Sequence, residues 1–246
     1  MAIFAAMRAG MEKELYKKFL SKKISVHHVC EVGVFMPEMS NILDFIVRDR
    51  IRTTLVEPDP RSIAAIRDYF RDFSNVRLLP YAVYDHHGTL ELVQRNASTF
   101  VATLPYSPAQ VNDAYEVRKE DKFTVECRTI DELDDGTIDL LSVDTEGSEW
   151  YVLKGLVSRP AIISVETHGK SYLNPFHREI GNWMLANGYE RWWMNKTDTV
   201  FYRKGSFYVG PGEKLRLAMT DIYVKLRRGR KKLEKLLRAR RKGRTG

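Results

Sequence analysis

The chain has 246 residues, of which 43% are hydrophobic and 11% aromatic, as in an ordinary soluble globular protein. This length fits one α/β domain with appendages better than two small domains, and no segment approaches the ~20 apolar residues of a membrane-spanning helix. The net charge of +8 is a property of the tail, because residues 214–246 carry +12 and the other 213 residues carry −4.

Hydrophobic periodicity predicts helices alternating with strands through the first third of the chain. An amphipathic helix over residues 7–22 comes first. Pro37 suits the first position of another helix, because the N–H that proline lacks has no helical partner there. The elements that follow the first helix are strand VHHVCEVG ending at Gly33, a helix over 37–49, strand IRTTLVE ending at Glu57, a helix over 60–73 and strand NVRLLP.

The rest of the chain continues this alternation. Residues 89–94 and 122–129 are predicted strands, and the polar stretch 104–121 between them exceeds the roughly 12–15 residues at which unstructured loops become uncommon. We therefore expect a substrate lid there. The later elements are a strand over 138–143, a helix over 149–156, strand PAIISVE, a helix over 177–187 and a hairpin formed by YERWWM, the turn NKTD and TVFYRK.

This order of elements predicts an α/β fold. Strands that alternate with helices imply right-handed crossovers and a mostly parallel sheet, in which the terminal hairpin inserts one antiparallel strand at the edge. Ligands bind such sheets outside the carboxyl ends of the strands. The residues at which each strand stops are therefore the candidate site.

Acidic residues stand at four of these strand ends. They are Glu31, Glu57, Asp144 with Glu146, and Glu166. Any one of them could cap the helix that follows it, which is the common role of such acids. Four acidic strand ends on one ligand-binding edge make capping a weaker explanation for the whole set.

The acids also indicate the kind of ligand. A phosphate-rich cofactor is not expected among carboxylates, and neither GxxxxGK[ST] nor GxGxxG occurs in the chain. A nucleoside that bears positive charge fits better, and S-adenosylmethionine carries a sulfonium and an ammonium group. Glu57, at the end of the second strand, suits hydrogen bonds to ribose hydroxyls.

Seven segments of the chain resemble, in order, the FkbM family of methyltransferases, over about residues 25 to 205. They are CEVGVFMPEMSNIL, TTLVEPDP, NVRLLPYAVYDHHGTLEL, RTIDEL, IDLLSVDTEGSEWYVLKGL, PAIISVE and GYERWWMNKTDTVFYRKG, the fifth being the most specific. The resemblance implies a class I methyltransferase fold, Rossmann-like, with a mostly parallel seven-stranded sheet. It also implies S-adenosylmethionine as cofactor and methyl transfer to a hydroxyl oxygen.

The resemblance carries over to individual positions. Glu31 and Gly33 match the acid and first glycine of the cofactor loop, Glu57 the ribose-binding acid and Ala82 a position near the adenine. The loop departs from the family where Pro37 replaces a second glycine, and Pro80 stands where an asparagine is frequent. The full set expected to bind the cofactor is Glu31, Gly33, Val34, Phe35, Glu57, Pro58, Tyr81, Ala82 and Asp144.

Asp144, Glu146 and His168 are the expected catalytic residues. Asp144 and Glu146 match the hallmark motif of the family, and Asp144 is expected beside the methyl group. His168 follows a strand end, and its ordinary pKa of ~6.5 suits a general base, although a loop histidine bonded to backbone is an equally good interpretation. Asp144, Glu146 and Glu166 could hold Mg²⁺ or Ca²⁺ instead. Because capping and cofactor binding explain these acids without a metal, we expect none.

The only cysteines, Cys30 and Cys127, lie in apolar strand-like runs without metal-ligand spacing. We expect buried free thiols in a reducing compartment. The N-terminal MAIFAAM lacks the basic start, the length and the cleavage site of a signal peptide. The expected location is cytoplasmic.

The tail has an apolar seam at alternating spacings of four and three residues. Its members are Leu215, Met219, Ile222, Leu226, Gly229, Leu233 and Leu236. A dimer-forming or core-docked helix, a basic amphipathic helix on anionic lipid, an RNA-binding arm and a frayed tail are the alternatives. The absence of aromatic residues after Tyr223 counts against single-stranded RNA. We expect residues 214–242 to contact the inner face of an anionic membrane, and oligomerisation is left open.

The expected protein is an S-adenosylmethionine-dependent O-methyltransferase that acts on a hydroxyl of a carbohydrate or a related small or lipid-linked acceptor. Two alternatives are a scaffold that has lost the cofactor, which Pro37 alone supports, and an RNA methyltransferase. The Asn/Asp-Pro-Pro-Tyr motif of many amino-directed enzymes is absent where VDTEG stands. The expected divisions are an N-terminal helical extension (1–24), a methyltransferase domain (25–208) and a basic amphipathic helical tail (209–246).

Overall fold

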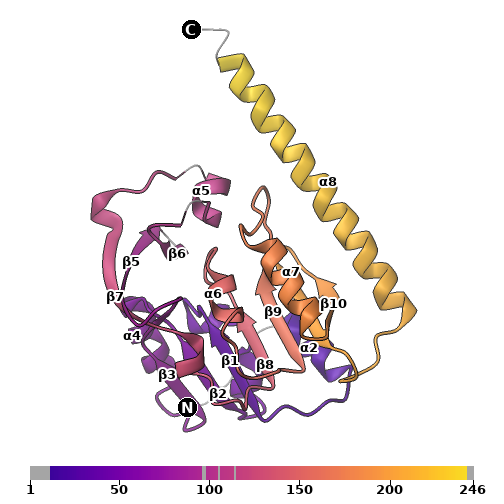
Figure 1. The fold of residues 1–246 in the computed structure, drawn as a ribbon. Coiled ribbons are helices and arrows are strands. Elements are labelled where there is room, and N and C mark those ends of the chain that lie inside the picture. The colour runs from indigo at the N-terminus through magenta and orange to yellow at the C-terminus, as the bar shows by residue number, and fades with distance from the viewer. Residues whose placement is uncertain (1–11, 96–97, 105, 114, 243–246) are drawn as a thin grey trace.

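Figure 1 shows the protein in a computed structural model, which describes residues 12–95, 98–104, 106–113 and 115–242. A seven-stranded sheet forms the centre of the molecule, with the strand order β10-β11-β9-β8-β1-β2-β3. Its strands are β1 (His28–Val32), β2 (Arg52–Val56), β3 (Val76–Leu79), β8 (Leu140–Val143), β9 (Ile162–Glu166), β10 (Tyr189–Met194) and β11 (Asp198–Arg203).

Most neighbouring strands in this sheet are parallel. β1 pairs in parallel with β2 and β8, and the pairs β2–β3 and β8–β9 are also parallel. β11 is antiparallel to both β9 and β10, and the β10–β11 hairpin occupies one edge. The prediction of a mostly parallel seven-stranded sheet with a terminal antiparallel hairpin is confirmed.

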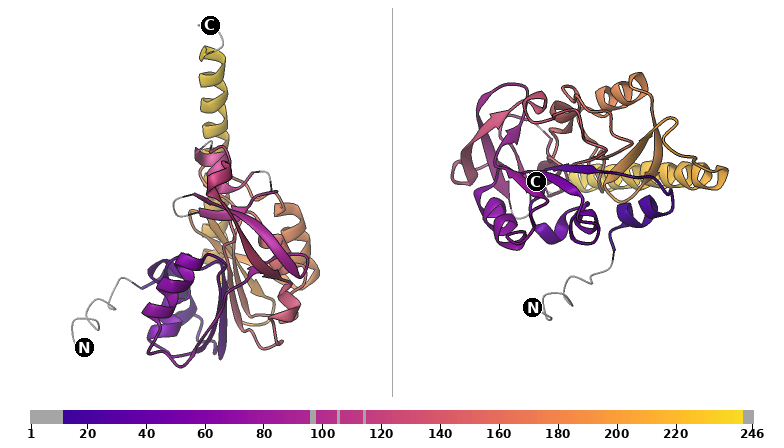
Figure 2. Two further views of the ribbon diagram at one scale, coloured as in Figure 1. Left: turned by 90° about the vertical axis from the view of Figure 1, so that its left-hand side faces the viewer. Right: turned by 90° about the horizontal axis from the view of Figure 1, so that it is seen from below.

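Helices cover both faces of the sheet (Figures 1 and 2). Because successive side chains of a strand point to opposite faces, Val29 of β1 packs in one apolar layer and Cys30 in the other. The first layer includes side chains of α2 (Glu14–Leu20), α3 (Leu43–Val47) and α4 (Pro60–Tyr69), and the second includes those of α6 (Glu149–Leu153) and α7 (His177–Ala186).

The helix predicted over 37–49 is interrupted. A short 3-10 helix, η1 (Pro37–Met39), gives way to extended backbone at Ser40, and α3 begins only at Leu43. The Ser40 hydroxyl and the Asn41 N–H donate hydrogen bonds to the carboxylate of Glu31, at 2.5 and 2.9 Å. These two donors are therefore turned toward the site rather than along a helix, which explains the break.

A second, four-stranded sheet lies beside the first, with the order β4-β7-β5-β6. Two of its strands correspond to the predicted strands 89–94 and 122–129, and β5 pairs antiparallel with both β6 and β7. β6 and the two-residue β4 were not predicted from the sequence. The strands are β4 (Ala82–Val83), β5 (Gly88–Arg95), β6 (Ser98–Val101) and β7 (Lys122–Arg128).

The N-terminal helix α2 is part of the core. Leu15, Tyr16 and Phe19 are buried, and the rings of Tyr16 and Phe19 meet that of Phe45 edge-on at centroid distances of 5.0 and 4.9 Å. The predicted helix start at residue 7, the MAIFAAM run and the last four residues of the tail lie outside the described residues.

The long helix α8 (Pro211–Lys242) is anchored at its start and then extends away from the sheets (Figures 1 and 2). Glu213 bonds Lys22 at 2.6 Å and accepts the indole N–H of Trp192 at 2.9 Å. Asp221 pairs with Arg191 of β10 at 3.3 Å. Within the described ranges, no helix has both the length and the apolar composition needed to cross a bilayer.

Candidate active site

The backbone after β1 passes very close to the end of β8. Gly33 has a φ of +83°, and a Cβ atom there would lie 1.8 Å from the main-chain oxygen of Asp144. Only glycine fits this position. The Gly33 N–H donates to the Val56 carbonyl, and the Asp144 N–H donates to the Val32 carbonyl, both at 2.9 Å. The ends of β1, β2 and β8 are thereby held together around one loop.

The carboxylate of Glu57 shapes this loop. One oxygen accepts the N–H groups of Val34 and Phe35, at 2.9 and 2.8 Å, and the other accepts the Asp59 N–H at 2.9 Å. Burial raises the pKa of Glu57, and the N–H donors oppose that rise. The sequence predicted Glu57 only as a ribose-binding acid, and this second role depends on the fold of the loop.

Glu31 is a buried acid of β1 beneath the same loop. Its hydrogen bonds from Ser40 and Asn41 only partly offset the cost of burial, which raises the pKa of Glu31 to about 7. Glu31 therefore holds the segment after Pro37 in place and takes up a proton near neutral pH.

A cavity of about 380 Å³ opens at the carboxyl ends of the parallel strands. All nine residues of the predicted cofactor set line it, and so does Glu146. Strands β5 and β6 of the small sheet form another wall, which the sequence did not predict. Their contribution comes from Leu90, Leu92, Ser98, Thr99, Phe100 and Val101. The alternation of Leu90 and Leu92 was visible in the sequence, but the direction they face depends on the second sheet.

The β10–β11 turn adds three polar residues to the cavity, which the sequence analysis also missed. They are Asn195, Thr197 and Asp198. The register pairs Asp198 with Glu166 across β11 and β9, so the turn lies next to another acidic strand end. Only the pairing of the hairpin with β9 could have indicated that the turn lies beside Glu166.

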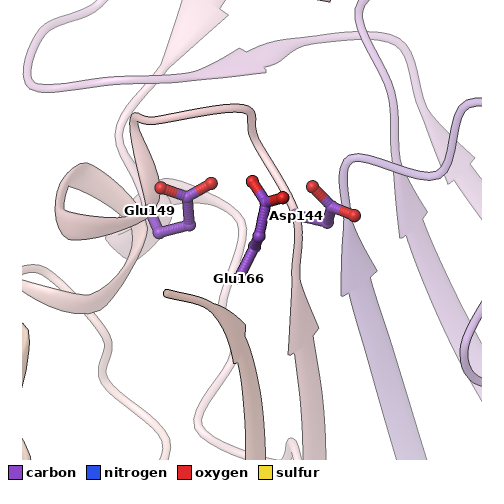
Figure 3. Close-up of side chains that lie close together, drawn as sticks. All are labelled: Asp144, Glu149 and Glu166. Carbon is purple, nitrogen blue, oxygen red and sulfur yellow. The ribbon is translucent and has the colours of Figure 1, made fainter. Parts of the chain in front are cut away.

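Three carboxylates gather beside this cavity (Figure 3). Asp144, Glu149 and Glu166 each offer an oxygen, and these oxygens lie within 4.8 Å of one another. Glu149 and Glu166 are buried, whereas Asp144 is partly exposed and lines the cavity. Burial, followed by the charge of Glu146, raises the pKa of Asp144 well above its usual range.

Glu149 is held by donors from its own turn. One oxygen accepts the N–H groups of Thr145 and Gly147, both at 3.0 Å, and the other accepts the side-chain amide of Asn174. The sequence predicts a helix that begins at Glu149. The structure adds that the Glu149 carboxylate fixes the turn connecting β8 to α6. Burial raises the pKa of Glu149 against these hydrogen bonds.

The segment expected to form a substrate lid contains short helices. The segment contains α5 (Pro108–Asp113) and a 3-10 helix, η2 (Lys119–Asp121), and none of its described residues lines the cavity. It lies over the acidic turn, since the Asn112 side chain accepts the Ser171 N–H at 3.1 Å and Ser107 lies beside Gly147. The segment therefore lies against the turn that follows β8.

His168 is not brought to this cavity. Its ring is buried and lines a separate cavity of about 340 Å³ that also includes Asp221 and Arg228 of α8. The Nε2 atom lies 3.2 Å from the Asn195 carbonyl, which requires a donor, and Nδ1 lies 2.9 Å from the Thr167 hydroxyl. Burial lowers the pKa of His168. Asp144 and Glu146 therefore line one cavity and His168 another.

The residues present fit S-adenosylmethionine. The cavity volume lies within the ~300–1,000 Å³ typical of small-molecule sites. Gly33 brings bare backbone to the wall. The lining includes the apolar side chains of Ala82, Leu90 and Leu92 and the acidic residues Glu57 and Asp144. Apolar side chains beside carboxylates suit S-adenosylmethionine, which joins an adenine ring to a positively charged sulfonium group.

This strand order, with one antiparallel strand beside the edge and an acid-lined cavity at the carboxyl ends, defines a class I, Rossmann-like methyltransferase. The sequence of residues 23–191 matches the model of the "Methyltransferase FkbM domain". The chain belongs to the FkbM methyltransferase family, and its cofactor is S-adenosylmethionine. The resemblance of the sequence to this family is confirmed.

Solved structures with a similar chain course include two bacterial methyltransferases. One is an S-adenosylmethionine-dependent methyltransferase from Aquifex aeolicus, with 11% identity, a TM-score of 0.42, and coverage of 78% of this chain and 89% of that chain. The other is precorrin-6y C5,15-methyltransferase from Geobacter metallireducens GS-15, with 11% identity, a TM-score of 0.41, and coverage of 76% and 87%. A comparison with curated protein sequences finds no match.

Proposed function

We propose that the enzyme transfers the methyl group of S-adenosylmethionine to a hydroxyl oxygen of a carbohydrate or a related small or lipid-linked acceptor. The observation that carries this proposal is the position of Asp144. Its partly exposed carboxylate lines the cavity directly beside the Gly33 loop, with Glu146 on the same wall. A basic carboxylate next to a cofactor site suits an acceptor that must lose a proton.

The nine cofactor-lining residues would hold S-adenosylmethionine, which supplies an activated methyl group on a sulfonium when bound. In this proposal Glu57 and the loop that it shapes hold the ribose side, and Ala82, Leu90 and Leu92 enclose the base. The sulfonium charge is met by the acidic wall at Asp144. Alignment of acceptor and methyl is the main catalytic contribution expected of such a site.

Asp144 is the proposed general base. The acceptor oxygen forms its new bond to the methyl carbon as the carbon–sulfur bond breaks, and the hydroxyl proton passes to a carboxylate oxygen of Asp144. Burial and the neighbouring acids make this carboxylate a stronger base than a solvated aspartate, because they raise its pKa. Glu146 adds to this effect through its charge.

Two alternatives receive less support. A scaffold without cofactor has no need of a glycine-only contact and an acidic wall at one cavity, and both are present here. An RNA methyltransferase would use the basic tail, yet α8 extends from the β10 edge, and none of the α8 side chains that the structure describes lines the Asp144 cavity.

The test uses S-adenosylmethionine with a deuterated methyl group. Purified enzyme is incubated with carbohydrate, lipid-linked and RNA fractions of a lysate, and mass spectrometry locates the label. We expect the labelled methyl group on hydroxyl oxygens of a carbohydrate or lipid-linked product. The Asp144→Asn variant should transfer no label, while calorimetry still detects cofactor binding. Label on RNA alone would favour the nucleic-acid alternative, and bound cofactor without label in any fraction would contradict the proposal.

We further propose that α8 brings the enzyme to an anionic membrane surface. The described seam residues Leu215, Met219, Ile222, Leu226 and Leu233 are all exposed, so they do not dock on the core of this chain. Basic side chains surround them, in a tail that carries a net charge of +12. An exposed apolar stripe within a basic helix is typical of interfacial membrane binding.

A further inference from the structure

We propose that Asp144, Glu149 and Glu166 together bind a divalent cation that prefers oxygen ligands. The three residues come from separate places in the fold, namely the end of β8, the start of α6 and the end of β9. Figure 3 shows their carboxylates side by side, with that of Glu166 between the other two. One oxygen of each lies within 4.8 Å of one oxygen of the others.

Unsatisfied oxygens at the same place point to a ligand. Oε2 of Glu166 and the hydroxyl of Tyr172 are buried and have no hydrogen-bond partner among the described residues. Tyr172 is fully buried, and its hydroxyl lies against the acidic turn, 3.4 Å from where a Cβ on Gly147 would stand. Buried polar groups are nearly always paired, so two orphaned oxygens around three acids indicate an absent partner.

Protein groups do not supply the missing positive charge. None of the ion pairs formed by the described residues involves Asp144, Glu149 or Glu166. Three carboxylates this close, two of them buried, repel one another strongly unless protons or a cation intervene. A cation bound between the three carboxylates would offset their charge and give Glu166 Oε2 a partner.

The cofactor alone cannot offset the charge of all three carboxylates. Asp144 lines the cavity proposed for S-adenosylmethionine, but Glu149 and Glu166 do not, and both lie behind Asp144. A sulfonium or ammonium group in the cavity therefore reaches only one of the three acids. A small ion bound between all three reaches the others and remains accessible to the acceptor through Asp144.

The chemistry of the donors restricts the ion. An all-oxygen set without histidine or cysteine favours Mg²⁺, Ca²⁺ or Mn²⁺ over zinc or copper. Oxygens up to 4.8 Å apart can bind Ca²⁺ on opposite sides without moving, since Ca–O distances are ~2.4 Å. Mg²⁺, with distances of ~2.1 Å, would require the widest pair to close slightly.

This inference rests on the proposed function only for its catalytic consequence. An ion at Asp144 would bind the acceptor hydroxyl and favour loss of its proton, so Asp144 would act by holding the ion rather than by taking the proton itself. Binding of the ion can be measured without any acceptor.

The binding test is titration calorimetry and thermal unfolding with Ca²⁺, Mn²⁺ and Mg²⁺ added separately to full-length protein stripped of metal. We expect one equivalent to bind and to raise the unfolding temperature. Glu166→Gln should weaken binding by at least about 10-fold, since even indirect metal partners contribute that much. Tyr172→Phe provides a second variant, which removes only the orphaned hydroxyl and should weaken binding less.

Glu179→Gln is the matched control, because it is the same change at an exposed position of α7. It should bind the ion as the wild type does. Absence of binding to wild-type protein at millimolar ion, or equal binding by Glu166→Gln and the control, would overturn the inference.

The activity test separates the two proposals. If chelation abolishes methyl transfer while S-adenosylmethionine still binds, both the ion and its catalytic consequence are supported. Transfer that persists in chelator, together with calorimetric ion binding, would leave the proposed function and the ion site intact and remove the catalytic consequence. Ion binding without transfer to any acceptor would contradict the proposed function alone.

Discussion

Gly33 and Asp144 lie so close that the loop after β1 and the end of β8 form one continuous wall of the cavity. A Cβ at position 33 would lie 1.8 Å from the Asp144 carbonyl oxygen, and φ there is +83°. The loop after β1 and the proposed general base Asp144 are therefore positioned by a single backbone contact. A change at Gly33 must move both.

Gly33→Ala should destabilise the protein and weaken cofactor binding. The left-handed backbone alone costs alanine about 1–3 kcal/mol, and displacement of the β8 end adds to this. Chemical denaturation and calorimetry with S-adenosylmethionine measure the two effects. Gly212→Ala is the matched control, because a Cβ there meets nothing within 4 Å. Unchanged cofactor affinity in a folded Gly33→Ala protein would argue against this loop as part of the site.

Glu31 should make the folded state less stable as pH rises through the window from 4.5 to about 7. Its pKa is raised from 4.5 to about 7 in the folded protein, so in this window the folded state binds more protons than the unfolded state. The contribution of this carboxyl is full below pH 4.5 and declines by roughly 3 kcal/mol as pH rises to 7.

Glu31→Gln removes this titration and keeps an acceptor for the Asn41 N–H. Denaturant unfolding from pH 4 to 8 should show a wild-type stability that falls relative to the variant as pH rises. The neighbouring acids contribute to both proteins and largely cancel in the difference. Parallel curves for the two proteins would mean that Glu31 keeps an ordinary pKa.

His168→Asn should lower stability without lowering turnover. The ring is buried with both nitrogens bonded, so its loss leaves partners unsatisfied at about 1–3 kcal/mol. A general base would instead lose roughly 10²–10⁴-fold in rate when removed. His87→Asn, at an exposed histidine, is the control. A loss of rate in that range with normal unfolding would restore His168 as the base.

Leu226→Glu should reduce sedimentation of the enzyme with anionic vesicles. The side chain is 69% exposed in the middle of the basic helix, and a negative charge there opposes both apolar insertion and attraction to the lipid. Leu185→Glu, at an equally exposed leucine of α7, is the matched control. Wild-type binding should also fade in high salt, because charge attraction is screened.

Equal sedimentation of the two variants would contradict membrane binding through α8. Analytical ultracentrifugation without lipid addresses the competing dimer. A wild-type dimer that becomes monomeric with Leu226→Glu would assign the seam to self-association instead.

The sequence determined the order of the elements and the residues of the cofactor cavity. Strands such as IDLLSV and PAIISVE are apolar on both faces, which predicts a parallel sheet covered by helices. Because the carboxyl ends of parallel strands meet at one edge, Glu31, Glu57 and Asp144 could be predicted as neighbours from their positions alone. The hallmark motif around Asp144 predicted by resemblance two acids, Asp144 and Glu146, that both line this cavity.

Tertiary structure decided what local patterns do not encode. Ser40 and Asn41 donate hydrogen bonds to the buried Glu31, and the helix predicted over 37–49 is interrupted at these residues. The side to which the residue after a strand end turns depends on contacts with distant segments. His168 contacts the Asn195 carbonyl and lines the second cavity rather than the cofactor cavity. The Asn174 side chain donates to Glu149 and to the Glu166 carbonyl and so joins the start of α6 to the end of β9. The second sheet forms its wall through pairing between strands far apart in the chain. Such contacts depend on the whole chain being folded, since their energy comes from burial and from long-range pairing rather than from neighbouring residues.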